Sequence, residues 1–331
     1  MASLFDPIEI KDLLLKNRVV MPPMYTGMAP ENGEVTDRHI EHYSARARGG
    51  AGLIIIEHTY ISPEGKMSDG QLGMDNDRLI PGLKRLVDTI HSEGSKIVVQ
   101  INHGGAQAPR DVIGLQPAGP WDIIPPNGAE APRPLAISEI KTLIKKFGEA
   151  AERAIAAGFD SVEIHGAHGY LLGQFLSPLA NQRGDIYGGN PEGRLLFPLE
   201  VISEVKSKLG QNVPLFYRIG ADDMIDGGLT PKDGKLVAVS MEKAGVDVID
   251  VSGGIGGTGR DRYSEQGYFI PLAEGIKKVV KVPVIGVGNI TEPEYANGVV
   301  EDGRVDLVAF GRILLANSEF PNEAAQKLGV T

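Results

Sequence analysis

The chain has 331 residues, of which 42% are hydrophobic and 23% are charged, which fits one barrel-sized domain over residues 1–331. The formal net charge of -10 argues against nucleic acid or an anionic membrane as a partner. Cysteine is absent, which excludes disulfides, thiolate metal sites, cysteine nucleophiles and cysteine-ligated iron–sulfur clusters. The first residues show no secretory signal and no apolar stretch is long enough to cross a bilayer, so we expect a cytoplasmic protein.

Short apolar runs alternate with longer amphipathic segments along the whole chain, which predicts strands alternating with helices and a parallel sheet. The candidate strands are Arg18–Met21, Gly52–Glu57, Lys96–Ile101, Ser161–His165, Pro214–Arg218, Val246–Ser252, Val282–Val287 and Val305–Phe310. Eight such units favour a closed (β/α)8 barrel of the TIM type, with an N-terminal hairpin cap. The alternative is a doubly wound open sheet.

Three further features are expected from the pattern between the strands. Apolar positions over Ile140–Ala157 and Leu195–Leu209 recur at helical spacing, and Ser138 is a candidate N-cap. Gly104–Arg133 and Leu179–Gly193 read as long loops after the third and fourth strands.

The segment Ser161–Tyr170 ends an apolar strand with His165, His168 and Tyr170. So much polarity at a buried strand end indicates a binding or catalytic site, because buried polar groups are costly unless they are paired. In parallel α/β barrels the strand ends are where active sites form. Alternatives are two core histidines with structural partners, or a metal site, for which no third ligand at convincing spacing is present.

Glycine-containing turns follow the last three strands and can expose backbone N–H groups to an anion. They are Ser252-Gly253-Gly254, Gly288-Asn289 and Gly311-Arg312. Turns after the seventh and eighth strands commonly bind phosphate in such barrels, so the pattern predicts a phosphate site. Ordinary strand-to-helix turns are the alternative.

Gln100 and Arg218 end the third and fifth strands, where we interpret both as donors to a flat polar ring. Paired structural groups in the core are the alternative. For Glu57, at the end of the second strand, we favour a structural ion pair, with Arg218 as a candidate partner.

Several of these segments together resemble the old yellow enzyme family of flavin-dependent ene-reductases, especially its bacterial short-chain branch and the barrel part of dienoyl-CoA reductases. The resemblance covers nearly the whole chain. Its segments are Leu14–Met24, Gln100, His165–Leu171, Phe175–Pro178, Asn181–Gly189 and Gly193–Arg194.

The resemblance implies non-covalent FMN across the barrel mouth and NADPH or NADH as the hydride donor. It places Pro23, Met24 and Tyr25 against the flavin ring, and Gln100 and Arg218 at its pyrimidine edge. The ribityl phosphate would be bound by the three glycine-containing turns, through Ser252, Gly253, Gly254, Gly288, Asn289, Gly311 and Arg312. His165 and His168 would bind the carbonyl oxygen of an activated alkene, and Tyr170 would protonate the α-carbon.

Tyr25 departs from the family pattern, which has Cys or Thr after Pro-Met, so Tyr25 could contact the flavin, line the substrate site or restrict it. Two alternatives to an NAD(P)H-dependent ene-reductase follow. One is a barrel subunit reduced by a separate redox partner protein, and the other is a flavin-binding protein whose site Tyr25 restricts. We expect a small-molecule activated alkene as the substrate and a homo-oligomer.

Overall fold

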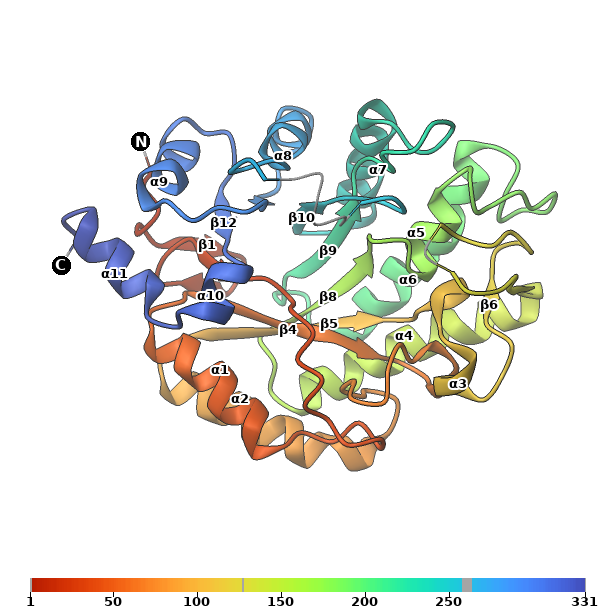
Figure 1. Cartoon of the computed structure of the whole chain (residues 1–331), viewed down its shortest axis with the longest axis horizontal. Coiled ribbons are helices and arrows are strands. Elements are labelled where there is room, and N and C mark those ends of the chain that lie inside the picture. The colour runs from red at the N-terminus through yellow and green to blue at the C-terminus, as the bar shows by residue number, and fades with distance from the viewer. Residues whose placement is uncertain (1, 127, 258–263, 331) are drawn as a thin grey trace.

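The computed structural model describes residues 2–126, 128–257 and 264–330, and its central feature is a closed parallel barrel (Figure 1). Around the barrel the strand order is β10-β11-β12-β3-β4-β5-β8-β9. The bounds are β3 Val19–Met21, β4 Leu53–Tyr60, β5 Lys96–Asn102, β8 Ser161–Gly166, β9 Leu215–Gly220, β10 Val248–Ser252, β11 Val284–Gly286 and β12 Leu307–Ala309. The eight candidate strands and the (β/α)8 barrel are confirmed, and the open sheet is wrong.

Helices surround the strands on the outside of the barrel (Figure 1). They are α1 Asp37–Arg48, α2 Ile80–Ser92, α4 Ile137–Ala156, α6 Pro191–Lys208, α7 Pro231–Ala244, α8 Ile270–Lys277, α9 Pro293–Glu301, α10 Arg312–Ala316 and α11 Phe320–Lys327. The apolar face of α4 is buried, as its spacing predicts. Its expected N-cap, Ser138, is wrong. The helix begins at Ile137, and its N-cap is Ala136, two residues before Ser138. The N–H of Ala136 donates to Glu139 Oε2 at 2.7 Å, so Glu139 satisfies a free N–H at the start of the helix.

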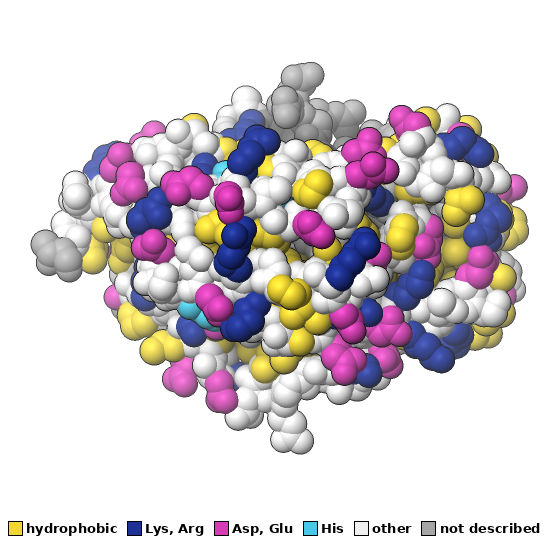
Figure 2. Space-filling model, turned by 90° about the horizontal axis from the view of Figure 1, so that it is seen from below, with side chains coloured by type: hydrophobic (Ala, Val, Ile, Leu, Met, Phe, Trp, Pro, Cys, Tyr) yellow, Lys and Arg dark blue, Asp and Glu magenta, His cyan; other side chains and the backbone are white. Residues whose placement is uncertain are grey.

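The two long loops contain only short elements. After β5 the chain forms α3 Arg110–Ile113 and the small parallel pair β6 Ala118–Gly119 and β7 Arg133–Pro134. After β8 it forms α5 Leu171–Leu176, and residues 177–190 then have no helix or strand. None of the described helices combines the length and the apolar character that a bilayer crossing requires. Acidic and basic side chains are interspersed over the face seen in Figure 2.

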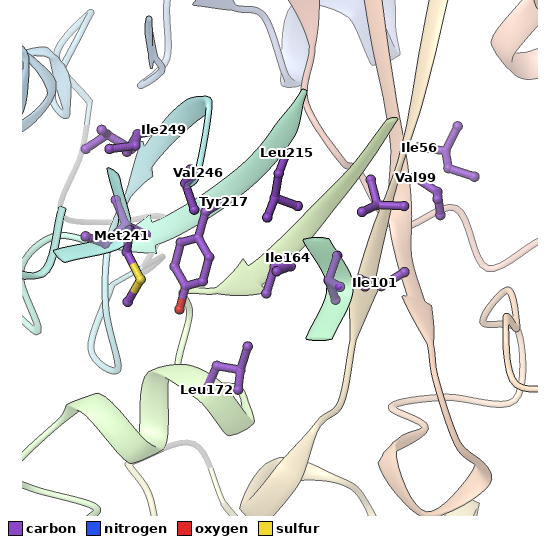
Figure 3. Packing of buried hydrophobic residues seen from close by; sticks show 14 of the residues in the cluster. Ile56, Val99, Ile101, Ile164, Leu172, Leu215, Tyr217, Met241, Val246 and Ile249 are labelled. Carbon is purple, nitrogen blue, oxygen red and sulfur yellow. The ribbon is translucent and has the colours of Figure 1, made fainter. Parts of the chain in front are cut away.

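Residues of opposite strand faces form two separate cores. One face packs against the helices, and Figure 3 shows Ile164 of β8 and Tyr217 of β9 pointing toward Leu172 of α5. The other face fills the barrel, for example with Val98, Phe216 and Val248. This alternation follows the two-residue period of a strand.

The antiparallel hairpin of β1 Ile8–Ile10 and β2 Leu13–Leu15 packs into the barrel interior, which confirms the expected cap. Leu13 and Leu15 are buried with the interior residues, whereas Leu14 between them is 58% exposed. The hairpin immediately precedes β3, so it closes the N-terminal end of the barrel. The site must therefore open at the other end.

Truncating Leu15 tests this closure. Leu15→Ala removes a fully buried side chain and should lower the free energy of unfolding by about 2–5 kcal/mol, because the cavity cannot fully collapse. Leu14→Ala makes the same change on the exposed face of the same strand and should cost no more than about 0.5 kcal/mol. Urea unfolding of both variants measures the difference, and equal losses would contradict the closing role of the hairpin.

Candidate active site

Inside the barrel, the inward-facing side chains change from apolar to polar toward the C-terminal ends of the strands. The change takes two residues along each strand. Gln100, Arg218 and Asp250 follow the interior residues Val98, Phe216 and Val248 by two positions, so they also face inward. On β8, Glu163 and His165 share this inward face. Strand pairing places Glu163 beside Gln100 of β5 and His165 beside Arg218 of β9.

Two carboxyl groups and one guanidinium are buried in this polar layer. Arg218 Nε lies 3.3 Å from Asp250 Oδ2, and Gln100 Nε2 donates to Glu163 Oε1 at 2.8 Å. Burial raises the pKa of Glu163 well above its usual value, and the nearby Asp250 raises it further. Burial also raises the pKa of Asp250, while Arg218 lowers it. With one positive charge present, we assign the proton to Glu163 and the negative charge to Asp250.

His165, His168 and Tyr170 converge above this layer. The His165 ring centroid lies 5.0 Å from that of His168 and 4.8 Å from that of Tyr170. The turn that brings them together uses left-handed backbone at His168 (φ 56°) and Gly169 (φ 72°). The positive φ favours glycine at position 169, and a Cβ there would also displace the Gln107 side chain, whose Nε2 would lie 2.4 Å away.

The hydrogen bonds assign the tautomers of the two imidazoles. His165 Nδ1 accepts from the N–H of Ala167 at 3.2 Å, so the proton of His165 is on Nε2. That Nε2 faces His168 Nδ1 at 3.2 Å, which leaves His168 Nε2 to donate to Ser252 Oγ at 2.8 Å. Burial lowers the pKa of both histidines well below the usual value, and Arg218 lowers both further. Both are therefore neutral hydrogen-bond groups at neutral pH.

A cavity of about 300 Å³ lies beside this cluster at the barrel mouth. Its lining residues come from the ends of several strands and the turns that follow them. They are Pro22, Pro23, Met24, His168, Arg218, Ser252, Tyr268, Phe269, Val287, Asn289, Ile290, Thr291, Gly311, Arg312 and Ile313. At one end Arg312 Nη2 donates to Asn289 Oδ1 at 2.7 Å, which orients a surface cation beside two turns.

These residues suit FMN. Arg218 is buried, and its Nε makes no hydrogen bond among the described residues despite lying near Asp250. A flat acceptor at the cavity wall would satisfy it. Gly288 has φ 135°, and a Cβ there would meet the backbone N of Phe269 at 2.8 Å, so only glycine fits this turn. Arg312 and the turns provide the positive end that a phosphate group requires.

Not every residue expected at the cofactor lies in the cavity wall. Gly253 and Gly254 are absent from the lining, and the N–H of Gly254 donates to Asp222 O at 2.7 Å, so this turn is committed to the neighbouring loop. Gln100 lies below the cavity in the polar layer, and Gly288 shapes the turn without lining it. Tyr268 and Phe269, which line it, gave no signal because they lie in a loop far from any motif.

Tyr25 is not among the residues that line the cavity. Its hydroxyl accepts from Ser68 Oγ at 2.6 Å, and its ring stacks on His58 with centroids 5.6 Å apart. The residue is 46% exposed. Tyr25 therefore does not fill the cavity in this structure.

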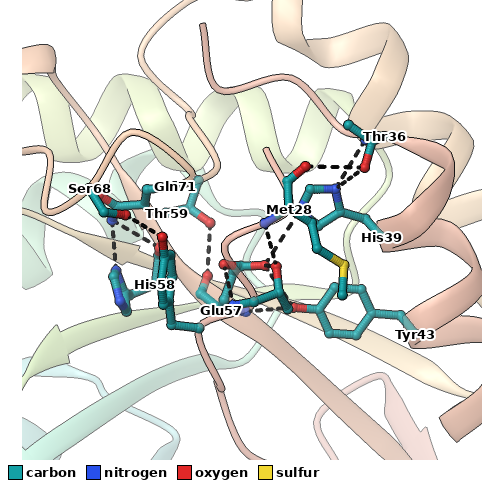
Figure 4. Close-up of polar contacts among 11 residues, drawn as sticks. Met28, Thr36, His39, Tyr43, Glu57, His58, Thr59, Ser68 and Gln71 are labelled. Carbon is teal, nitrogen blue, oxygen red and sulfur yellow. Dashed lines mark hydrogen bonds and ion pairs between the residues drawn. The ribbon is translucent and has the colours of Figure 1, made fainter. Parts of the chain in front are cut away.

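The expected ion pair between Glu57 and Arg218 is wrong. Glu57 accepts from Thr26 Oγ1 at 2.6 Å and from the N–H of Thr26 at 3.0 Å, and it contacts Tyr43 of α1 (Figure 4). The cause is a β-bulge in β4 between Ile56 and Thr59. Strict alternation after the interior residue Ile55 would place Glu57 inside the barrel, and the bulge turns it toward α1 instead.

Glu57 and Thr26 fix the loop that carries Pro23 and Met24 into the cavity wall, and this contact should depend on pH. Burial raises the pKa of Glu57 from 4.5 to about 7, so the folded protein holds this proton more tightly than the unfolded chain. The stability contributed by the proton is present below pH 4.5 and is lost as the pH rises to about 7.

Between pH 4.5 and 7, wild type should therefore lose about 3 kcal/mol in free energy of unfolding relative to Glu57→Gln. Urea titrations of both proteins at several pH values measure this difference. Glu41→Gln, at a carboxylate that is 76% exposed, is the control. If the free energies of unfolding of wild type and Glu57→Gln differ by the same amount at every pH between 4.5 and 7, the raised pKa of Glu57 is wrong.

Comparison with known proteins places the chain in a family. The family described as NADH:flavin oxidoreductase / NADH oxidase matches residues 3–330. The NADH oxidase of Thermoanaerobacter brockii is 46% identical over 98% of this chain, which spans 51% of that protein. The NADPH dehydrogenase of Clostridium acetobutylicum is 40% identical over 98% of this chain and 95% of its own length.

Solved structures agree. A complex of 2-naphthoyl-CoA reductase with 2-naphthoyl-CoA superposes with a TM-score of 0.93 at 29% identity, covering 98% of this chain and 52% of that one. The old yellow enzyme homologue of Zymomonas mobilis superposes with a TM-score of 0.88 at 30% identity, covering 100% and 94%. Family membership implies FMN as the cofactor and NADH or NADPH as the hydride donor. The chain belongs to the NADH:flavin oxidoreductase / NADH oxidase family, which confirms the resemblance to old yellow enzyme.

Proposed function

We propose that the chain is an NAD(P)H-dependent, FMN-containing ene-reductase that reduces the double bond of an α,β-unsaturated carbonyl compound. The observation that carries the proposal is the meeting of His165, His168 and Tyr170 beside the cavity lined by Arg218 and Arg312. Two imidazole donors and one phenol are the groups that such a reduction requires from the protein.

In this proposal FMN occupies the cavity and supplies hydride transfer. Pro23 and Met24 would lie against its ring and Arg218 at its pyrimidine edge, with Gln100 beneath Arg218 in the polar layer. Ser252, Asn289, Gly311 and Arg312 would hold the phosphate end, and Gly288 would shape the turn. Gly253 and Gly254 would support Ser252 from behind, because the structure commits the Gly254 N–H to Asp222.

His165 and His168 would bind the carbonyl oxygen of the substrate. Both are neutral donors, and an N–H directed at that oxygen stabilises the negative charge that develops there as the β-carbon is reduced. In the structure these N–H groups donate to His168 Nδ1 and to Ser252 Oγ, so the substrate oxygen would replace both acceptors when it binds.

Tyr170 would protonate the α-carbon. Burial raises the pKa of its phenol, so the group carries its proton at neutral pH and can act as a general acid. The N–H of Tyr170 donates to Ala167 O, and its ring packs against His165, which fixes the phenol next to the oxygen-binding pair.

Two alternatives compete with direct reduction of bound FMN by NADH or NADPH. One is a separate redox protein as the electron donor; the chain spans 51% of the NADH oxidase. Direct reduction by nicotinamide is favoured by the NADPH dehydrogenase, which the chain matches over 95% of its length. Restriction of the site by Tyr25 has less support, because the tyrosine is held by Ser68 and His58 outside the cavity.

Tyr170→Phe tests the proton donor. The substitution removes the hydroxyl and should lower the rate of alkene reduction by about 100-fold or more, while the reduction of bound FMN by NADPH keeps its rate. Anaerobic stopped-flow absorbance separates the two half-reactions. An equal loss in both would contradict the general-acid role.

His165→Ala tests the oxygen-binding pair. Phenols present an oxygen that mimics the negative charge of the reacting carbonyl, so their dissociation constant should rise by about tenfold or more. Calorimetric titration of the FMN-loaded protein with para-chlorophenol measures it. His91→Ala, on the surface helix α2, is the control, and an unchanged affinity in His165→Ala would remove the role assigned to this residue.

A further inference from the structure

A third histidine, His58, lies beside the candidate site and has no role in the mechanism above. The bulge that turns Glu57 toward α1 directs His58 to the barrel mouth instead. There its ring stacks on Tyr25, and its centroid lies 5.6 Å from that of Tyr170 (Figure 4 shows His58 pointing away from the Glu57 cluster). Tyr170 is thus flanked by His165 and by His58.

The hydrogen bonds of Gln71 assign the tautomer of His58. Gln71 Oε1 must accept from the N–H of Met67 at 2.6 Å, so the amide nitrogen faces the other way. That nitrogen donates to His58 O at 3.0 Å and lies 2.7 Å from His58 Nδ1. Its second hydrogen therefore goes to Nδ1, and the proton of the imidazole is on Nε2.

This Nε2–H group has no hydrogen-bond partner among the described residues, and its ring lies next to Tyr170. Among the described residues His165 and His168 have protein partners for their ring nitrogens, whereas no partner is found for Nε2 of His58. Gln71 is fully buried and is fixed by the N–H of Met67 and by His58 O, so turning the imidazole would break its hydrogen bond at Nδ1 and leave the Gln71 amide without that acceptor. Tyr25 supports its outer face.

We propose that His58 donates from Nε2 to a second polar acceptor of the substrate, distinct from the oxygen bound by His165 and His168. This inference rests on the proposed function and narrows its substrate class to activated alkenes with two acceptors at opposite ends, such as enediones. Rejection of substrates without the second acceptor follows from the same geometry, because they leave the positioned donor unpaired.

The pair His58→Phe and His58→Gln tests the donor separately from the ring. Phenylalanine keeps an aromatic ring between Tyr25 and Tyr170 but has no N–H, whereas glutamine has an amide N–H of similar reach. Each variant is loaded with FMN and titrated calorimetrically with para-hydroxybenzaldehyde, which has a second acceptor, and with phenol, which has none. Both ligands have a phenol oxygen, so the ratio of their affinities removes the contribution that this oxygen makes to binding.

In His58→Phe the affinity for para-hydroxybenzaldehyde divided by the affinity for phenol should fall by about tenfold relative to wild type. His58→Gln should restore part of this ratio. The ratio of kcat/KM for ketoisophorone to that for 2-methylcyclohexenone should change in the same way. His91→Phe makes the same substitution at a surface histidine and should keep both ratios.

A wild-type ratio in His58→Phe would overturn the inference. So would an equal loss in both His58 variants, because the ring and not its donor would then be responsible. Failure of the proposed function is a separate result. If wild type reduces neither enone, the ene-reductase assignment is wrong, and the calorimetric ratio still decides whether His58 binds a second acceptor.

Discussion

The ion pair of Arg218 and Asp250 inside the barrel is the interaction on which the candidate site depends. Both residues are buried, and together with Glu163 they place three ionisable groups in one layer. Such burial costs several kcal/mol per ion unless the charges are paired and hydrogen-bonded. Directly beneath, the interior is apolar and closed by the hairpin of β1 and β2, so the hydrophobic core offsets this cost.

The consequence for the site is a fixed positive charge at the cavity wall. Burial is the main cause that lowers the pKa of His165 and of His168, and Arg218 lowers both further. The two imidazoles therefore stay neutral and donate without carrying charge. The buried ion pair thus contributes to the electrostatics of both the cavity and the two imidazoles, together with burial.

Most of the fold and the centre of the site could be predicted because they follow from local patterns. Strand positions follow from apolar runs, and His165, His168 and Tyr170 lie within six residues of one strand end, so they must be close. Arg218 and Asp250 follow the two-residue period that fills the barrel. The roles of these residues remain proposals.

The remaining features depend on details without a local pattern. The bulge in β4 exchanges the directions of Glu57 and His58, and nothing in Ile54–Tyr60 marks where the extra residue falls. The pair of Glu57 with Arg218 was therefore predicted wrongly, and the position of His58 beside Tyr170 was not predicted. The turn of Gly253 and Gly254 resembles a phosphate loop, but its packing against Asp222 depends on a neighbouring strand end.

The central claim is that this barrel mouth holds FMN and passes reducing equivalents from nicotinamide to an activated alkene. An anaerobic visible absorption titration of the purified protein with NADPH or NADH, followed by cyclohexenone, tests it most directly. The account predicts a yellow protein that nicotinamide bleaches and the enone restores. If the protein is yellow but neither NADH nor NADPH bleaches it, its flavin would have to be reduced by another protein. A colourless protein that FMN cannot reconstitute would contradict the account.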